Sequence, residues 1–154
     1  MKRLGLYFTL IAILALSSAA IEKSDCDTRA LKNELIKELR PDFKYDSSNI
    51  NRFILENKKQ GTEIQVPIFS SEKYRLLFNT AALPSDFEIL IYDKKHDERN
   101  RKLLFSVKGS ETDQHVFIFE PENAKTMYID YILPGVEEEG ISGCIVFLMG
   151  YKIS

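Results

Sequence analysis

Apolar residues along this chain follow two different spacings, one before Pro41 and one after it. Between residues 25 and 40 a leucine recurs every fourth position, at Leu31, Leu35 and Leu39, with charged residues between. This pattern predicts an amphipathic helix. Ser24-Asp25-Cys26-Asp27 has the spacing of a capping box, Asp27 is itself an alternative cap, and Pro41 ends the helix. A helix with one apolar stripe needs a surface to pack against.

After Pro41, apolar residues alternate with polar ones, as in β-strands. Eight short segments carry this alternation, with Gly, Pro, Asn or Asp in the turns between them. They are Ile50–Leu55, Glu63–Ile68, Tyr74–Phe78, Phe87–Tyr92, Leu103–Val107, His115–Phe119, Met127–Leu133 and Cys144–Tyr151. We therefore expect a mainly β protein: a single antiparallel β-sandwich or jelly roll with the N-terminal helix packed on it. Pro67 predicts an edge strand or a bulge in the second segment.

Three of these segments are apolar on both faces, which a half-exposed sheet does not require. They are residues 89–92, 116–119 and 144–149. Two interpretations follow. The helix covers the second face, with a Cys26–Cys144 disulfide fastening it to the last strand, or an apolar patch stays exposed and binds a partner.

The first 20 residues have the order of a secretory signal peptide. Lys2 and Arg3 precede an uncharged, largely apolar run of 13 residues, Leu4–Leu16, and Ser18 and Ala20 fit a small-residue cleavage site. Cleavage predicts a mature chain of residues 21–154 that forms one domain in the periplasm of a bacterium or is secreted. An uncleaved anchor is the alternative, but the apolar run is shorter than the roughly 20 residues of a typical span. We thus expect no membrane span after cleavage.

The charge of the mature chain limits its partners. Loss of Lys2 and Arg3 from the 21 basic residues leaves 19 against 23 acidic ones, a net charge of −4. Nucleic-acid binding depends on a basic surface, so we expect no nucleic-acid partner. The sequence also has no basic run that would attract an anionic membrane.

Two cysteines remain in the mature chain, and an exported protein with an even number of them favours a disulfide. A Cys26–Cys144 bond would join the two ends of the chain. The alternative is two free thiols. Cys144 would then be an ordinary buried side chain in an apolar strand, and Cys26 a thiol made reactive by a helix N-terminus.

Residues with catalytic chemistry are scarce. His96 lies in the charged run from Asp93 to Lys102, which is typical of a solvated loop, and His115 starts an apolar strand. Neither the Gly-x-Ser-x-Gly nor the His-Glu-x-x-His motif occurs. We assign no catalytic residue, no cofactor and no metal ligand. A carbohydrate site is disfavoured because the chain has no Trp, and Tyr128 and Tyr131 fall on opposite faces of one strand.

The stretch from Glu63 to Lys152 carries a recognisable series of segments. They are Ile64-Gln65-Val66-Pro67-Ile68, Ser70-Ser71-Glu72, Tyr74-Arg75-Leu76, Glu88–Asp93, Phe117–Pro121, Met127–Tyr131 and Gly143–Phe147. It resembles the jelly-roll module of the bacterial pre-peptidase C-terminal type and small exported Bacteroidetes-type β-sandwich proteins. The resemblance implies an accessory or binding domain without catalytic residues. This chain departs from that module because a helix precedes it and no enzyme is attached.

Taken together, the sequence predicts an exported, non-enzymatic β-sandwich that binds a protein or a cell-envelope component. A structural or envelope-maintenance protein without a ligand is the alternative, and a carbohydrate-binding module is a weaker one. An uncovered apolar patch in the structure would favour binding, and a helix that covers it would favour the structural role.

Overall fold

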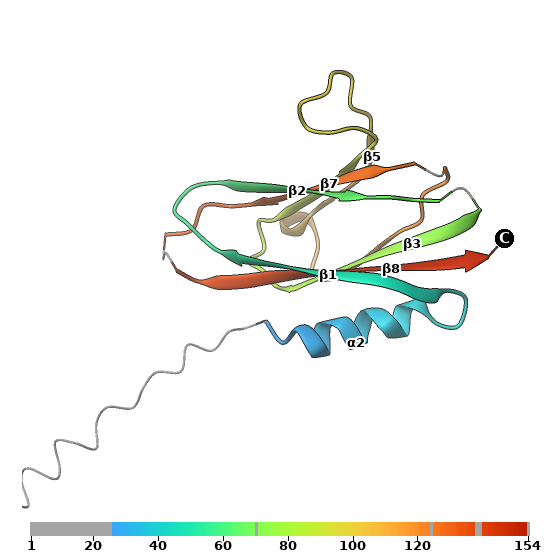
Figure 1. Cartoon of the computed structure of the whole chain (residues 1–154). Coiled ribbons are helices and arrows are strands. Elements are labelled where there is room, and N and C mark those ends of the chain that lie inside the picture. Colours follow the sequence, from blue (N-terminus) through green and yellow to red (C-terminus); the bar gives the residue numbers. More distant parts are fainter. Residues whose placement is uncertain (1–25, 70, 124, 138–139, 154) are drawn as a thin grey trace, which may run out of the picture.

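The described part of the protein is a sandwich of two four-stranded antiparallel sheets with one α-helix on the outside (Figure 1). The computed structural model describes residues 26–69, 71–123, 125–137 and 140–153, so the predicted signal peptide lies outside the described residues. The elements are α2 (Thr28–Leu39), β1 (Lys44–Ile54), β2 (Gln60–Val66), β3 (Glu72–Ala82), β4 (Glu88–Tyr92), β5 (Leu103–Lys108), the 3-10 turn η2 (Gly109–Glu111), β6 (Val116–Phe119), β7 (Met127–Leu133) and β8 (Ser142–Ile153). The predicted fold class and all eight predicted strands are confirmed.

The strand order is that of a jelly roll. One sheet has the order β1-β8-β3-β6, and the other has the order β2-β7-β4-β5. The antiparallel pairs β1·β8, β2·β7, β3·β6 and β4·β5 are nested, as in one long hairpin that has been rolled up. β2 is an edge strand, as Pro67 indicated, although the strand ends at Val66, just before the proline.

The main core fills the space between the two sheets. Alternate residues of the central strands meet there, among them Phe78, Ile89, Ile129, Tyr131 and Phe147. β7 shows the pattern most clearly, since its burial alternates without exception along seven residues. Tyr131 therefore points into the core and Tyr128 points outward, so the two lie on opposite faces, as the sequence predicted.

The helix α2 packs on the outer face of the β1-β8-β3-β6 sheet (Figure 1). The Asp27 carboxylate caps it by accepting a hydrogen bond of 3.0 Å from the backbone N–H of Ala30. Leu35 and Leu39 are fully buried in a second core cluster, together with Leu77, Val146 and Leu148 on the sheet. At Gly150 a Cβ atom would collide with Leu39, so a glycine is needed where the end of the helix meets β8.

A disulfide joins Cys26, directly before the cap of α2, to Cys144 in β8. It closes a loop with a sequence separation of 118, and both cysteines are buried within the second core cluster. This bond confirms the predicted pairing and excludes the two alternatives with free thiols. Within the described part of the chain, no helix is long and apolar enough to cross a membrane.

One sequence interpretation was too broad. We expected α2 to cover the second apolar face of all three doubly apolar segments, and it does so for residues 144–149 of β8. β4 lies in the opposite sheet, so the helix cannot reach Leu90 or Tyr92. Ile118 of β6 lies on the same face as α2, but its side chain stays 40% exposed at the sheet edge.

Replacing Tyr131 with Phe is expected to raise the free energy of unfolding by about 1 kcal/mol. The Tyr131 hydroxyl is buried in the main core and has no hydrogen-bond partner among the described residues. Burial also raises the pKa of this hydroxyl, because the charged form would lose its contact with water. Chemical unfolding of both proteins measures the difference. The outward-facing Tyr128→Phe is the control, and a clear loss of stability in Tyr131→Phe would contradict the prediction.

Candidate functional site

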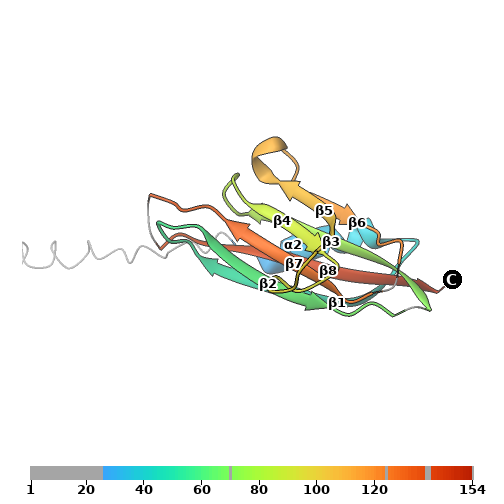
Figure 2. The ribbon, with the colours of Figure 1, turned by 90° about the horizontal axis from the view of Figure 1, so that it is seen from above.

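The sandwich has two open sides, where the edge strands of the two sheets face each other. β1 and β2 form one open side, and β5 and β6 form the other, as Figure 2 shows from above. Inward-pointing residues at an open side are only partly covered by the rest of the protein. The polarity of these residues therefore shows what each side is adapted to contact.

The β1/β2 side has mainly polar residues at its inward positions. Residues of β1 that pair with core positions of β8 point inward, and three of the four are polar: Ser47, Asn49 and Asn51, followed by Phe53. β1 also carries charged residues, which discourage pairing with another strand. β2 is mixed, because Gln60 and Thr62 are polar at its inward positions whereas Ile64 and Val66 are apolar.

The β5/β6 side has the opposite character, because every inward position is apolar. These residues are Leu104, Phe105 and Val107 of β5 and Phe117 and Phe119 of β6. Only Phe117 is buried; the other four stay half-buried because no further strand covers them. Phe105 and Phe119 stack across the opening, with ring centroids 5.1 Å apart.

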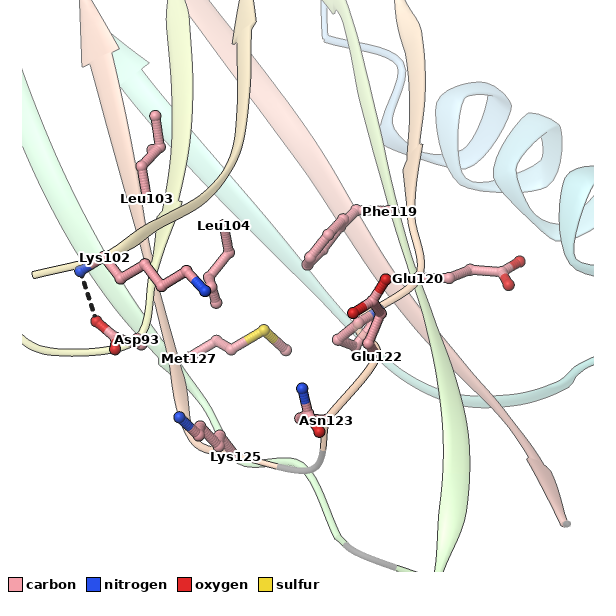
Figure 3. A pocket seen from close by; sticks show the side chains of 11 residues that line it. Asp93, Lys102, Leu103, Leu104, Phe119, Glu120, Glu122, Asn123, Lys125 and Met127 are labelled. Atoms are coloured by element: carbon pink, nitrogen blue, oxygen red, sulfur yellow. Dashed lines mark hydrogen bonds between the residues drawn. The ribbon is translucent and has the colours of Figure 1, made fainter.

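A cavity of about 330 Å³ opens at one end of this side (Figure 3). Its apolar surface comes from Leu104, Phe119 and Met127, which belong to three different strands. The β4·β5 pairing has a bulge at this point, and Figure 3 shows Leu104 pointing into the cavity while the Leu103 side chain points away from it. The volume is at the small end of the range of about 300–1,000 Å³ for ligand pockets, so it suits one side chain or a small molecule.

Two of the acidic groups near the cavity are already engaged. The Asp93 carboxylate accepts a hydrogen bond of 2.8 Å from the backbone N–H of Lys102, and this bond lowers the pKa of Asp93. Glu120 points away from the cavity in Figure 3 and forms an ion pair of 2.6 Å with Arg75. These interactions fix the two backbone segments that border the opening.

Three charged side chains at the rim have no ion pair among the residues that the structure describes. They are Lys102, Lys125 and Glu122. In Figure 3 Lys102 lies beside Leu104 of β5, Lys125 lies below Met127 on the segment that leads into β7, and the Glu122 carboxylate lies on the β6 side. The two lysines outnumber Asp93, the one carboxylate on their side of the cavity, so that part of the rim is weakly basic, although the lining as a whole has two lysines and three acidic residues.

A separate charged cluster lies on the outer face of the β2-β7-β4-β5 sheet. The Arg101 guanidinium donates hydrogen bonds to both carboxylate oxygens of Asp130 at 2.9 and 3.2 Å and to Glu63 at 3.0 Å, and it stacks 3.8 Å from the ring centre of Tyr92. The Asp130 hydrogen bonds raise the pKa of Arg101. This cluster fastens the β4–β5 connection to the sheet and covers the apolar face of Tyr92. All its groups are satisfied by one another, so we regard it as structural.

The residues singled out in the sequence are not brought together. His96 is in the exposed β4–β5 connection, with Nδ1 at 3.5 Å from Glu63, and His115 precedes β6. Cys26 and Cys144 are bonded on the far side of the other sheet. Over the described ranges, no group of three or more His, Cys, Asp or Glu side chains is arranged to hold a metal ion.

Sequence reasoning placed the residues that line the cavity in strands and did not single them out. Leu104, Phe119 and Met127 point inward, but the sequence does not show that β5 and β6 are edge strands. One signal was present. Residues 116–119 contain no polar residue at all, although short edge strands commonly carry a charge or a proline.

Comparisons with known proteins assign no family. No protein-family model and no curated protein matches the chain. Among solved structures, one similar chain is described by the words "Bacillus endospore appendages form a novel family of disulfide-linked pili". It is 11% identical, the alignment covers 73% of this chain and 90% of that chain, and the TM-score is 0.36. At this score the likeness transfers neither fold nor function. The resemblance to the pre-peptidase C-terminal module stays a prediction.

Proposed function

We propose that this protein works outside the cytoplasm as a non-enzymatic binding module that engages a protein or cell-envelope partner through the β5/β6 side. One observation carries the proposal: this open side presents only apolar inward residues, whereas the β1/β2 side presents mainly polar ones. Both sides have the same architecture, so architecture alone does not account for the difference. An apolar, uncovered edge is unfavourable in water unless a partner covers it.

The location rests on two features. The disulfide requires an oxidising compartment to form and persist, and residues 1–20 have the order of a signal peptide. We propose that cleavage after Ala20 releases residues 21–154 as one domain. Intact mass measurement of the exported protein tests this point, because retention of residues 1–20 would make it a membrane-tethered protein instead.

Binding accounts for the cavity better than catalysis does. The cavity combines an apolar part with a charged rim. Two of the nearby carboxylates, Asp93 and Glu120, are held by other groups of the protein. A general acid–base pair needs groups that converge on a substrate with suitable pKa values. A sugar site usually needs an exposed aromatic platform, and Tyr128 and Tyr131 lie on opposite faces of β7.

The proposal is tested by site-specific photocrosslinking in cells that export the protein. A photoreactive residue at Leu103, 47% exposed beside the cavity, is expected to give a discrete crosslinked product. The same residue at Ile50, 40% exposed on β1, is the matched control and is expected to give none. Adding Leu104→Asp should abolish the product at Leu103. Equal crosslinking at both positions, or none at Leu103, would contradict the proposal.

A purely structural role is the second candidate, and α2 is the observation that favours it. The helix covers the apolar outer face of one sheet, and a disulfide fastens it there. A protein with this role would need no partner at β5/β6. Absence of crosslinking at Leu103 together with export and stable accumulation would favour this role.

A further inference from the structure

We propose that the partner of the β5/β6 side is an extended peptide segment that pairs with β5 as an added strand and places one large apolar side chain in the cavity. This inference rests on the proposed function and specifies the class of ligand. Its chemistry follows from the free backbone edge of β5, from the half-covered side chains behind that edge, and from the charges at the rim.

The backbone of β5 offers a free edge. β5 pairs with β4 on one side only and is the last strand of its sheet. Its outer backbone groups have no strand partner among the described residues. Adding a peptide strand to such an edge is a general mode of recognition, in which main-chain hydrogen bonds supply affinity. Six residues at about 3.3 Å each extend over about 20 Å, so a segment of six to eight residues covers β5.

The side chains behind this edge require apolar cover. A strand beside β5 would place alternate side chains inward, over Phe105 and Val107 and toward Phe119 of the opposite sheet. At the end near Leu104, one inward side chain would enter the cavity of about 330 Å³. Burial of a large apolar side chain is favourable in proportion to the area that it removes from water, so that position is the main determinant of specificity.

A peptide fits this side better than a second copy of the chain does. In a symmetric contact between two copies, β5 would pair with β5 and bring Lys102 and Lys108 of both copies to the same interface. On this side of the cavity the two lysines at the rim, Lys102 and Lys125, outnumber the single carboxylate of Asp93, and the remaining positive charge favours an acidic residue next to the apolar anchor of the ligand. The ligand is thus a segment with alternating apolar residues, one of them bulky, beside an Asp or Glu.

The test is selection from a library of random linear twelve-residue peptides displayed on phage, with the mature, disulfide-bonded protein as bait. We expect enriched peptides to share the alternating apolar pattern with an adjacent acidic residue. Synthetic versions should bind at least tenfold more weakly to Leu104→Asp and severalfold more weakly to Lys102→Glu. The matched control, Ile50→Asp on β1, should bind as the wild type does. In the complex, amide hydrogen exchange should slow at alternate residues of β5.

Each contrary outcome has a distinct meaning. Peptides that bind Leu104→Asp and wild type equally, or leave amide exchange in β5 unchanged, would overturn the inference. So would a concentration-dependent dimer that Leu104→Asp dissociates, because the occupant would then be a second copy. Crosslinking at Leu103 without any enriched peptide would overturn the inference that the ligand is a peptide and leave the proposed function standing. If there is neither crosslinking nor peptide enrichment, the inference and the proposed function are both overturned. Circular dichroism spectra that match the wild type establish that the variants fold.

Discussion

Leu35→Asp is expected to lower the free energy of unfolding by about 5 kcal/mol. The Leu35 side chain has no exposed surface and lies between α2 and the outer face of β3 and β8. An aspartate there would leave a carboxylate without a partner in an apolar layer and would also remove the packing of the leucine. Loss of a buried leucine alone costs about 2–5 kcal/mol. The charge adds a desolvation penalty, so the helix should no longer dock.

Equilibrium unfolding in urea, followed by circular dichroism and tyrosine fluorescence, measures this effect because the chain has no Trp. Asn33→Asp is the matched control. It adds the same side chain to an exposed position of the same helix, and its effect should stay within about 0.5 kcal/mol. If Leu35→Asp unfolds at the same urea concentration as the wild type, α2 does not contribute to the stability of the sandwich.

Replacing Cys26 and Cys144 together with alanine is expected to destabilise the protein by about 4–5 kcal/mol in the chain-entropy model. The disulfide closes a loop with a sequence separation of 118, which restricts nearly the whole unfolded chain. It also holds the start of α2 against β8. The double variant therefore loses both the restriction of the unfolded state and the covalent attachment of the helix.

Thermal unfolding with and without a reducing agent gives an internal control for this prediction. The reductant should lower the melting temperature of the wild type, once the buried bond is reduced in the unfolded state, and should leave that of the double variant unchanged. The apolar outer face of β3 and β8 should also become more accessible to a hydrophobic dye in the double variant. A melting temperature equal to that of the oxidised wild type would contradict a stabilising role for the bond.

The two apolar surfaces of this protein therefore have different explanations. On the β1-β8-β3-β6 sheet, α2 covers the outer face, and the protein supplies its own partner for Leu77, Val146 and Leu148. On the β5/β6 side, no described segment covers Leu104, Phe105 and Phe119 fully. From the sequence, a covering helix and a binding patch were alternative explanations for the segments that are apolar on both faces. The structure assigns the helix to one place and leaves an uncovered apolar side in another.

The sequence by itself determined the elements and most of the faces. Helical spacing and the Asp27 cap located α2, and alternation located eight strands, because both periodicities are local properties of the backbone. It also limited an internal disulfide to Cys26 and Cys144, since the chain has two cysteines, and the structure decided that this bond forms. Inward and outward residues of β7, such as Tyr131 and Tyr128, followed from the same alternation.

Only the tertiary structure decided which strands lie at the edges and which distant charges meet. Alternation shows the face to which a side chain points, but the position of a strand in its sheet depends on pairing between segments far apart in sequence. For that reason Leu104 and Phe119 had the same pattern as core residues, although they line an open side. Arg101 reaches Glu63 and Asp130, which are 38 and 29 residues away. From the sequence we expected the segment from Asp93 to Lys102 to be a solvated loop. In the structure the contacts of Arg101 fasten this segment to the sheet.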